Sequence, residues 1–494
     1  MNGMSKVYLI GAGPGDEELL TLRGKRILEK CDAVLYDRLA NDSLLKYLNE
    51  KCKIYYCGKQ PGCHYKSQDE INDMLVKLAQ EGNIVGRIKG GDPYIFGRGG
   101  EEALRLEKEK IEFEVIPGIT SVVAVLNYAG IPVTHRGMAQ SFHVFTGKSA
   151  EKLEINWEAV AGLSGTLIFL MGLENIETIT NSLIGNNKAG ECPCAVIMRG
   201  TTSKQKKVVG TLSDICSRVR IAGLKSPCII VVGEVVTLND KLNWYERKPL
   251  FGMNICITRS REQSIEINER LLDLGAQVTA INSIKIKDTS NYLKDYIEKL
   301  SSYNYVVFTS VNGVNLFFKY LKDNEFDIRN ISGGFCAIGP VTAEAIKAMG
   351  IVPVIIAKKF VGESLLSELK ERIKPGDEIL IPGAREARTY LGEELAKLHC
   401  SVDEVPIYEI EAGTLQNEDS FDDVDTIIFT SPSTVKNMIS MLGISRITEK
   451  ECIAIGPITG GELCKNNIKY SACDEYSSDG IIKKLLQLEG EKHA

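Results

Sequence analysis

Short apolar runs alternate with longer amphipathic segments along the whole chain, and this alternation restricts the fold more than any other feature. The runs are rich in β-branched, leucine and aromatic residues, as buried strands are. Strands that alternate with helices indicate an α/β protein with mainly parallel sheets. The predicted strands are Val7–Ile10, Ala33–Tyr36, Thr166–Met171, Cys228–Val232, Ile255–Thr258, Val306–Thr309, Ile379–Pro382 and Ile427–Thr430.

The length of the chain, 494 residues, exceeds what one hydrophobic core accommodates, so about two to four domains are expected. A boundary is predicted within Lys241–Gly252, because a new strand begins directly after it at Met253. A linker of about eight residues spans at most roughly 28 Å, so the domains that it joins are neighbours. We therefore predict one domain over residues 1–245 and a second over residues 250–494.

The second half contains an internal duplication. Three segments recur in the same order, displaced by about 120 residues, and a helical pattern follows the weakest pair in both copies. The repeat predicts two similar α/β subdomains with a cleft between them. The matched pairs are Tyr305–Ser310 with Thr426–Ser431, Ala337–Thr342 with Ala454–Thr459 and, more weakly, Ile257–Glu262 with Ile381–Glu386.

Composition excludes several functional classes. Hydrophobic residues make up 44% and charged residues 25% of the chain, as in ordinary globular proteins. The net charge of −6 gives no overall basic field for nucleic acid. No apolar run approaches the roughly 20 residues that span a membrane, and Met1–Lys6 leads into a strand without a signal peptide. We expect a cytoplasmic protein without nucleic-acid or membrane partners.

The cysteines and histidines do not form the spacings of metal sites. The sequence has 14 cysteines but no Cys-x-x-Cys pair, and its five histidines show no His-x-x-x-His or His-Glu-x-x-His grouping. Without a secretory signal, most of these thiols are expected to be small buried apolar groups in a reducing compartment. We predict no metal.

A glycine-rich loop, Gly11–Asp16, follows the first predicted strand. Its glycines, at 11, 13 and 15, miss the G-x-G-x-x-G spacing that places a pyrophosphate on a helix N-terminus. Pro14 removes a backbone N–H, and Asp16 adds a negative charge where a phosphate would lie. The loop is therefore poorly suited to an anion.

Further clusters of glycine and polar residues follow other predicted strands of the first half. Ligands of open α/β sheets bind beyond the carboxyl ends of the strands, where these clusters are expected. Each cluster alone is weak evidence, because glycine-rich βα loops are often only tight turns. The clusters are Tyr36–Leu39, Cys57–Gly62, Lys89–Pro93, Phe96–Glu101, Ile116–Ser121 and Gly130–Arg136.

Taken in order, these motifs resemble those of uroporphyrinogen-III C-methyltransferases, which are tetrapyrrole methylases that use S-adenosyl-L-methionine (AdoMet). The resemblance covers residues 5–240 and continues through Met171-Gly172 and Val232–Val235. It implies two α/β domains with AdoMet in the cleft between them, usually in a homodimer. The implied reaction methylates C2 and C7 of uroporphyrinogen III to give precorrin-2.

The resemblance also implies which residues contact AdoMet. AdoMet carries a sulfonium cation and no phosphate, so Asp16 and Asp92 are tolerable near it. Ser121 stands where the family often has alanine, which leaves the inference intact. The implied contacts are Pro14, Gly90, Gly91, Asp92, Ile95, Thr120, Ser121, Met171 and Gly200.

The implied catalytic pair is Asp37 as proton acceptor and Lys59 as proton donor. Methylation of an sp² pyrrole carbon requires a proton to move, and positioned acid and base groups accelerate such steps by roughly 10²–10⁴-fold. Without the motifs, Asp37 would be interpreted as a surface partner of Arg38, and Lys59 as a solvated loop residue. Carboxylates of uroporphyrinogen could bind cations by charge-assisted hydrogen bonds. The substrate-binding candidates are Arg98, Arg136 and Lys59, together with Glu101 from the motif of Arg98.

Residues 253–490 resemble uroporphyrinogen-III synthases, although the pattern is looser. The resemblance implies two interleaved, flavodoxin-like subdomains, one from residues 253–286 plus 412–490 and one from residues 290–408. It also implies that hydroxymethylbilane is cyclised with inversion of ring D, which produces the substrate of the methyltransferase. The motifs are Ile257–Arg259, Phe308–Ser310, Ala337–Pro340, Val405–Tyr408, Phe429–Pro432 and Ala454–Pro457.

The synthase resemblance points to one reactive side chain, Tyr408, which could assist departure of the hydroxyl group. No Ser-His-Asp or Cys-His set is visible, and the main task is to fold a flexible polyanion. Hydroxyl groups at strand ends, next to helix N-termini, could bind carboxylates of the substrate. It is at least as probable that each of these residues is only an ordinary helix N-cap. The candidates are Thr309, Ser310, Thr430 and Ser431, with Arg261 and Arg385 as weaker ones.

The leading hypothesis is a bifunctional enzyme that converts hydroxymethylbilane to uroporphyrinogen III and then to precorrin-2, for siroheme or cobalamin. One alternative is a methylase that acts on a later corrinoid intermediate. Another is that the second half is a non-catalytic tetrapyrrole-binding module. The chain contains no dinucleotide fingerprint for a dehydrogenase step and no candidate chelatase segment.

Overall fold

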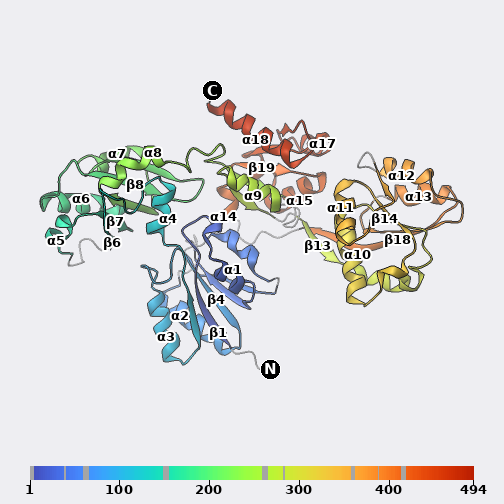
Figure 1. Ribbon diagram of the computed structural model, residues 1–494, viewed down its shortest axis with the longest axis horizontal. Coiled ribbons are helices and arrows are strands. Elements are labelled where there is room, and N and C mark those ends of the chain that lie inside the picture. The colour runs from blue at the N-terminus through green and yellow to red at the C-terminus, as the bar shows by residue number, and fades with distance from the viewer. Residues whose placement is uncertain are drawn as a thin grey trace. The chain divides into compact units, whose positions relative to one another are not determined.

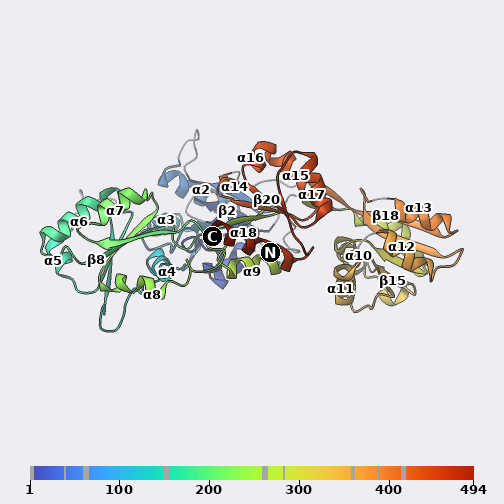
Figure 2. The ribbon, with the colours of Figure 1, turned by 90° about the horizontal axis from the view of Figure 1, so that it is seen from above.

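The computed structural model describes residues 5–37, 41–49, 51–58, 66–147, 155–258, 265–281, 284–357, 362–387, 389–412 and 419–493. The chain divides into two compact units, whose helices and strands are drawn in Figures 1 and 2. One unit comprises Met1–Ile281, Gln416–Val435 and Ile444–Ala494, and the other Asn282–Leu415 and Lys436–Gly443. Because the first unit includes both sides of residues 245–250, the predicted domain boundary stays a prediction.

The first sheet of the N-terminal half is fully parallel, in the order β3-β2-β4-β1-β5. Successive residues of a strand face opposite sides of the sheet. Val7 and Leu9 accordingly pack with α2 and α3, while Ile10 packs in the cluster that contains α1. The elements are β1 (Lys6–Gly11), α1 (Leu22–Leu28), β2 (Ala33–Tyr36), β3 (Lys53–Tyr56), α2 (Gln68–Gln80), β4 (Ile84–Lys89), α3 (Gly99–Lys108) and β5 (Phe113–Ile116).

The second sheet departs from the predicted parallel arrangement. Its order is β6-β7-β10-β8-β9, and only β6 and β7 are parallel, while the other pairs are antiparallel. Apolar runs predict buried strands in either direction, so the sequence pattern did not reveal the difference. The elements are α4 (Ser121–Tyr128), β6 (Phe142–Thr146), α5 (Trp157–Gly162), β7 (Thr166–Leu170), α6 (Ile176–Gly185), β8 (Pro193–Met198), β9 (Lys206–Thr211), α7 (Ile215–Ala222), β10 (Cys228–Val232) and α8 (Asn239–Leu242).

The third sheet belongs to the first unit and is fully parallel, in the order β12-β11-β19-β20-β21. Helices on the chain between or after these strands cover it, and α9 and α18 share its core cluster. The elements are β11 (Asn254–Ile257), α9 (Ile265–Asp273), β12 (Gln277–Ala280), α14 (Asp419–Asp422), β19 (Thr426–Phe429), α15 (Pro432–Leu442), α16 (Ile444–Thr448), β20 (Glu451–Ala454), α17 (Pro457–Lys465), β21 (Ser471–Ala472) and α18 (Ser478–His493).

The fourth sheet, in the second unit, has the order β13-β18-β17-β14-β15-β16, and only β13 is antiparallel to its neighbour. Its core holds Phe308, Phe317 and Phe335. The elements are β13 (Ile284–Asp288), β14 (Tyr305–Phe308), α10 (Val311–Asp323), β15 (Gly334–Ala337), α11 (Pro340–Ala348), β16 (Ile355–Ile356), α12 (Gly362–Lys370), β17 (Glu378–Ala384), α13 (Tyr390–Lys397) and β18 (Ser401–Ala412).

The third and fourth sheets confirm the internal duplication. By the repeated segments, β11 corresponds to β17, β19 to β14 and β20 to β15. The strands β11-β19-β20 are adjacent in the third sheet, and β17-β14-β15 are adjacent in the same order in the fourth. The chain passes from β12 to β13 and returns from β18 to β19, so the sheets are interleaved in sequence as predicted.

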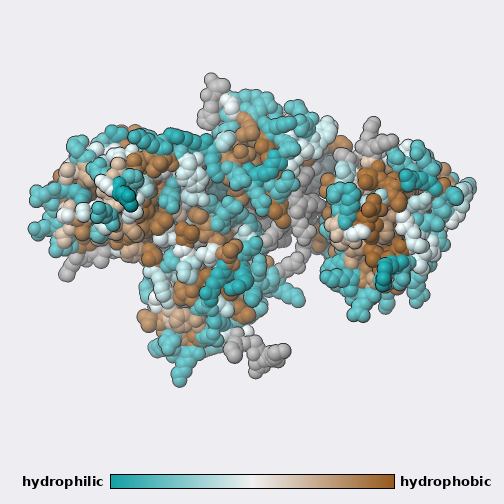
Figure 3. Space-filling view, viewed as in Figure 1, coloured by the Kyte–Doolittle hydropathy of each residue, from teal (hydrophilic) through white to brown (hydrophobic). Residues whose placement is uncertain are grey.

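Apolar residues also reach the surface of both units (Figure 3). Val341 and Ile458, at matched positions of the repeats, are 72% and 73% exposed.

Within the described ranges, no helix combines the length and the apolar character needed to cross a membrane.

Three loops meet through their backbones at the carboxyl edge of the first sheet. The N–H of Ala12 donates to the carbonyl of Lys89 at 2.8 Å, and the N–H of Gly91 donates to the carbonyl of Gly13 at 2.7 Å. A Cβ on Gly118 would collide with the carbonyl oxygen of Gly91 and lie 2.6 Å from Cα of Gly11. Only glycine fits where the loops after β1, β4 and β5 cross.

Replacing Gly118 by alanine tests this contact. Because the colliding atoms belong to the backbone, Gly118→Ala should lower the free energy of unfolding of the first sheet by about 2–3 kcal/mol. The measurement is differential scanning calorimetry of the full chain. Gly100→Ala is the control, since a Cβ at this position of α3 meets nothing within 4 Å. Equal melting temperatures for the two variants would contradict the account.

Candidate active sites

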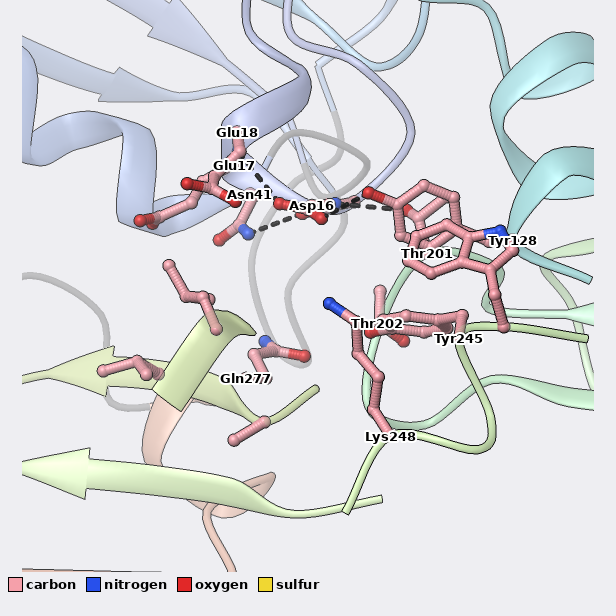
Figure 4. A pocket seen from close by; sticks show the side chains of 15 residues that line it. Asp16, Glu17, Glu18, Asn41, Tyr128, Thr201, Thr202, Tyr245, Lys248 and Gln277 are labelled. Atoms are coloured by element: carbon pink, nitrogen blue, oxygen red, sulfur yellow. Dashed lines mark hydrogen bonds between the residues drawn. The ribbon is translucent and has the colours of Figure 1, made fainter. Parts of the chain in front are cut away.

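The opening loop is held by its own acidic residue. The Asp16 carboxylate accepts a hydrogen bond from the Tyr128 hydroxyl at 2.7 Å and caps the short helix that starts at Glu17. The N–H of Asp16 donates to the Thr201 hydroxyl at 3.1 Å, and Figure 4 shows this set from close by. Asp16 thus fastens the loop to residues from two other parts of the N-terminal half. The sequence interpretation, which weighed Asp16 only as a charge near a ligand, missed this role.

A cavity of about 190 Å³ adjoins the same loop (Figure 4). None of the predicted AdoMet contacts lines it. Lys248 extends into it from the wall opposite the acidic residues. The lining residues are Gly15, Asp16, Glu17, Glu18, Asn41, Tyr128, Thr201, Thr202, Trp244, Tyr245, Lys248, Leu272, Ala276, Gln277 and Val278.

The structure brings several predicted AdoMet contacts together at the crossing loops. Asp92 accepts hydrogen bonds from the N–H groups of Gly118 at 3.1 Å and Tyr94 at 2.9 Å. A Cβ built on Gly91 would lie 3.8 Å from the Ser121 nitrogen and 3.9 Å from Cα of Thr120. Gly90, Gly91, Asp92, Thr120 and Ser121 therefore belong to one patch of adjoining backbone.

Two other predicted contacts adjoin each other. A Cβ built on Gly15 would lie 3.4 Å from the carbonyl oxygen of Gly200, so the turn that contains Pro14 abuts the Gly200 loop. Met171 follows β7 with φ 56° and is 47% exposed, and Ile95 is 44% exposed. These two side chains offer apolar surface to a ligand.

Of the predicted catalytic pair, the structure describes Asp37, and Lys59 lies outside the described residues. The Asp37 carboxylate does not stand in a simple surface ion pair. It accepts a hydrogen bond at 2.9 Å from the guanidinium of Arg87, whose side chain is 4% exposed. The side chain of Asp37 itself is 28% exposed. One side of the carboxylate is therefore buried against a cation.

A buried ionic network surrounds that cation. Glu102, at the start of α3, is fully buried and accepts from Arg87 at 3.1 Å and from Lys89 at 3.0 Å. Burial alone would lower the pKa of Arg87, but the carboxylates of Glu102 and Asp37 outweigh it and raise that pKa. Burial and the neighbouring Arg87 lower the pKa of Lys89.

The ionic network of Arg87, Lys89 and Glu102 was not predicted, although the sequence contains a signal for it. Arg87 and Lys89 occupy alternate positions of an apolar strand, so both point to the same face of the sheet. Two cations on a buried face require a buried anion, because unpaired charges are too costly there. Glu102 supplies it from α3.

In the first half, the side chains of the predicted substrate binders Arg98, Glu101 and Arg136 reach solvent, and Lys59 lies outside the described residues. Arg98 has φ 57° at the start of α3, and its guanidinium lies 2.6 Å from the carboxylate of Glu101. The hydrogen bond from Arg98 lowers the pKa of Glu101. Arg136 is exposed in the turn after α4. A substrate carboxylate at Arg98 would therefore compete with Glu101.

In the second unit, Tyr408 and Ser310 meet at the carboxyl edge of the fourth sheet. Their hydroxyl groups share a hydrogen bond of 2.9 Å, and Tyr408 is only 5% exposed. Burial raises the pKa of Tyr408, and the hydrogen bond with Ser310 acts in the opposite direction. Tyr408 thus carries its proton at neutral pH. Thr309 precedes Ser310 and is half-buried.

The strand-end hydroxyls act as helix caps in both repeats. Ser310 accepts from the N–H of Gly313 at 3.0 Å and caps α10. Ser431 accepts from the N–H of Thr434 at 3.3 Å at the start of α15, directly after the half-buried Thr430. Both serines therefore satisfy the capping interpretation, and their binding role stays a prediction.

Of the two arginines that were weaker candidates for binding substrate carboxylates, only Arg385 belongs to the described residues. Arg385 pairs with Glu409 at 2.7 Å, and its guanidinium lies 5.3 Å from the centre of the Tyr292 ring. Arg261 lies outside the described residues. Among the described residues, no group of three or more His, Cys, Asp or Glu side chains is arranged to hold a metal ion.

Comparison with known sequences relates each half of the chain to a family. The family model of the tetrapyrrole (corrin/porphyrin) methylases matches residues 6–216. The family model of uroporphyrinogen-III synthase HemD matches residues 265–483.

Similar curated proteins span one half or the whole chain. The porphyrin biosynthesis protein HemD of Ruminiclostridium josui is 34% identical over 494 residues, which cover 98% of each chain. A uroporphyrinogen-III C-methyltransferase of Bacillus subtilis is 46% identical over 245 residues, 49% of this chain and 95% of that one. An S-adenosyl-L-methionine-dependent uroporphyrinogen III methyltransferase of Methanosarcina barkeri is 46% identical over 240 residues, 48% of this chain and 94% of that one.

The methylase family matches most of the part of the chain that forms the first two sheets, and the synthase family matches most of the part that forms the third and fourth sheets. The chain belongs to the HemD porphyrin biosynthesis proteins, with a uroporphyrinogen-III C-methyltransferase as its first half and a HemD-type uroporphyrinogen-III synthase as its second.

Proposed function

We propose that the chain catalyses two consecutive reactions. The second half cyclises hydroxymethylbilane to uroporphyrinogen III, and the first half methylates that product at C2 and C7 with AdoMet to give precorrin-2. The observation that carries the proposal is that one chain matches both families, each over one half. The relatives of the first half are named for uroporphyrinogen III, which favours this substrate over a later corrinoid.

The described residues fit AdoMet. The loops after β1, β4 and β5 pack backbone against backbone at their crossing, which fixes the positions of the adjoining residues Gly90, Gly91, Asp92, Thr120 and Ser121. Ile95 and Met171 add exposed apolar surface, as small-molecule sites require. AdoMet supplies an electrophilic methyl group on a sulfonium. We assign its binding to Pro14, Gly90, Gly91, Asp92, Ile95, Thr120, Ser121, Met171 and Gly200.

In methylation, the substrate carbon gains a methyl group and a proton must then leave the ring. We assign Asp37 as the acceptor of that proton, because its carboxylate is partly exposed while Arg87 fixes it from the buried side. Lys59 is assigned as the proton donor from the family resemblance. Arg98 and Arg136 are assigned to the carboxylates of the substrate, and Glu101, the ion-pair partner of Arg98, to substrate binding. The exposure of the three side chains supports this assignment.

In cyclisation, the hydroxyl group of hydroxymethylbilane leaves as water. Tyr408 is assigned as the group that assists its departure, since a buried phenol keeps its proton at neutral pH. Thr309, Ser310, Thr430 and Ser431 are assigned to carboxylates of the substrate. We also propose that the chain forms a homodimer through its first half and works in the cytoplasm.

The two activities can be measured separately on the full chain. With uroporphyrinogen III and AdoMet, we expect a product with two added methyl groups, at C2 and C7. With hydroxymethylbilane alone, we expect the type III isomer. Methyl groups at other positions would contradict the first assignment, and the type I isomer alone would contradict the second.

Replacing Asp37 tests the methylation site. Asp37→Ala should reduce methylation of uroporphyrinogen III by about 10² to 10⁴-fold, because the proton acceptor is lost. The rate of type III formation from hydroxymethylbilane should not change. Both rates are followed by chromatography of the oxidised products. Loss of both activities in a folded variant would contradict the separation of the sites.

Replacing Tyr408 tests the cyclisation site. Tyr408→Phe keeps the buried ring but removes the hydroxyl group that is bonded to Ser310, so type III formation should slow by about 10²-fold. Methylation of supplied uroporphyrinogen III should be unaffected. The matched control is Tyr303→Phe, since Tyr303 is also buried in this unit and bonds Asp403 instead. Equal cyclisation rates in the two variants would show that the Tyr408 hydroxyl has no special part.

A further inference from the structure

Four charged side chains form one connected group beside the first sheet. Arg87 and Lys89 come from β4, Glu102 from α3, and Asp37 follows β2. The side chains of Arg87, Lys89 and Glu102 are 4%, 5% and 0% exposed, whereas that of Asp37 is 28% exposed. Two positive and two negative groups balance, so the buried group carries no net charge.

Such a group is costly to bury and adds little stability. Each buried ion loses several kcal/mol of hydration, and apolar residues of similar volume often serve a fold equally well. Gln68 adds a further hydrogen bond to Glu102 at 3.1 Å, which keeps its carboxylate fixed. A network of this cost indicates a role other than stability.

The network holds the guanidinium of Arg87 on three sides. Nε donates to Glu102 at 3.1 Å, Nη1 donates to the carbonyl of Ile88 at 2.9 Å, and Nη2 donates to Asp37 at 2.9 Å. A planar guanidinium bonded in this way cannot turn away from Asp37. The position of the Asp37 carboxylate is therefore set by residues that lie behind it.

We propose that Arg87, anchored by Glu102, is a positioning residue for methylation that holds the Asp37 carboxylate in place and aimed at the substrate. The proposal rests on the proposed function, in which Asp37 accepts the proton of the methylated ring. Lys89 neutralises the rest of the charge on Glu102, so that Glu102 does not repel the acceptor.

The proposal separates the charge of Arg87 from its geometry. Arg87→Gln removes the cation but leaves Glu102 paired with Lys89 and Gln68. Its kcat for methylation should fall by about 10-fold or more, since the acceptor is no longer fixed. The KM for uroporphyrinogen III and the Kd for AdoMet should stay the same.

Two further variants complete the experiment. Arg87→Lys restores the charge without the planar fork that bonds Glu102 and Asp37, so its kcat should recover only in part. Arg105→Gln is the matched control: Arg105, in α3, also pairs with an aspartate and a glutamate, Asp73 and Glu109. Its kcat should not change. Isothermal titration with AdoMet reports whether each variant keeps a folded methylase site.

The outcomes distinguish this inference from the proposed function. If Asp37→Ala still methylates at the parent rate, Asp37 is not the acceptor, and the role of Arg87 is overturned with it. If Asp37→Ala is inactive but Arg87→Gln behaves as Arg105→Gln does, only the role of Arg87 is overturned. If Arg87→Gln binds no AdoMet, Arg87→Lys decides: a reduced kcat with the parent Kd for AdoMet supports the proposal, and the parent kcat overturns it.

Discussion

The crossing of three backbone loops at the carboxyl edge of the first sheet is the contact on which the methylase half depends. Gly11, Gly91 and Gly118 approach so closely that no side chain fits between them. This contact brings the ends of β1, β4 and β5 to one place, and the predicted AdoMet contacts after β4 and β5 lie around it. The same edge of the sheet presents Asp37 and the buried network of Arg87 behind it. The predicted AdoMet contacts after β4 and β5 and the proposed proton acceptor after β2 thus lie on one sheet, while Met171 and Gly200 follow strands of the second sheet.

The synthase half is built on repetition instead. Two sheets with equivalent strand positions share one continuous chain that leaves the first after β12 and returns to it at β19. In each sheet a strand-end serine caps the next helix, and in the second unit that serine also bonds the buried Tyr408. Capping and binding are compatible, because an N-cap leaves other helix N–H groups free for an anion.

Much of the fold follows from local pattern. The apolar runs at Ala33–Tyr36 and Cys228–Val232 are strands with these bounds, and the repeated segments around Phe308 and Phe429 occupy matched strands. The direction of the strands could not be predicted from local pattern, since the antiparallel pairing of β10 with β7 and β8 depends on contacts between distant residues. For the candidate site, the motifs marked the loops but not the Arg87–Glu102 network. Its members lie 15 residues apart in sequence and meet only when α3 packs on the sheet. The role of Asp16 as an anchor for Tyr128 was hidden for the same reason, because 112 residues separate them.

The central claim is that one chain performs two consecutive steps, and conversion of hydroxymethylbilane in a single reaction tests it most directly. The purified full chain is incubated with hydroxymethylbilane and AdoMet that carries a labelled methyl group, and the products are analysed by mass and by isomer. The account predicts precorrin-2 with two labelled methyl groups on a type III skeleton. Unmethylated type I product alone would contradict both halves of the claim.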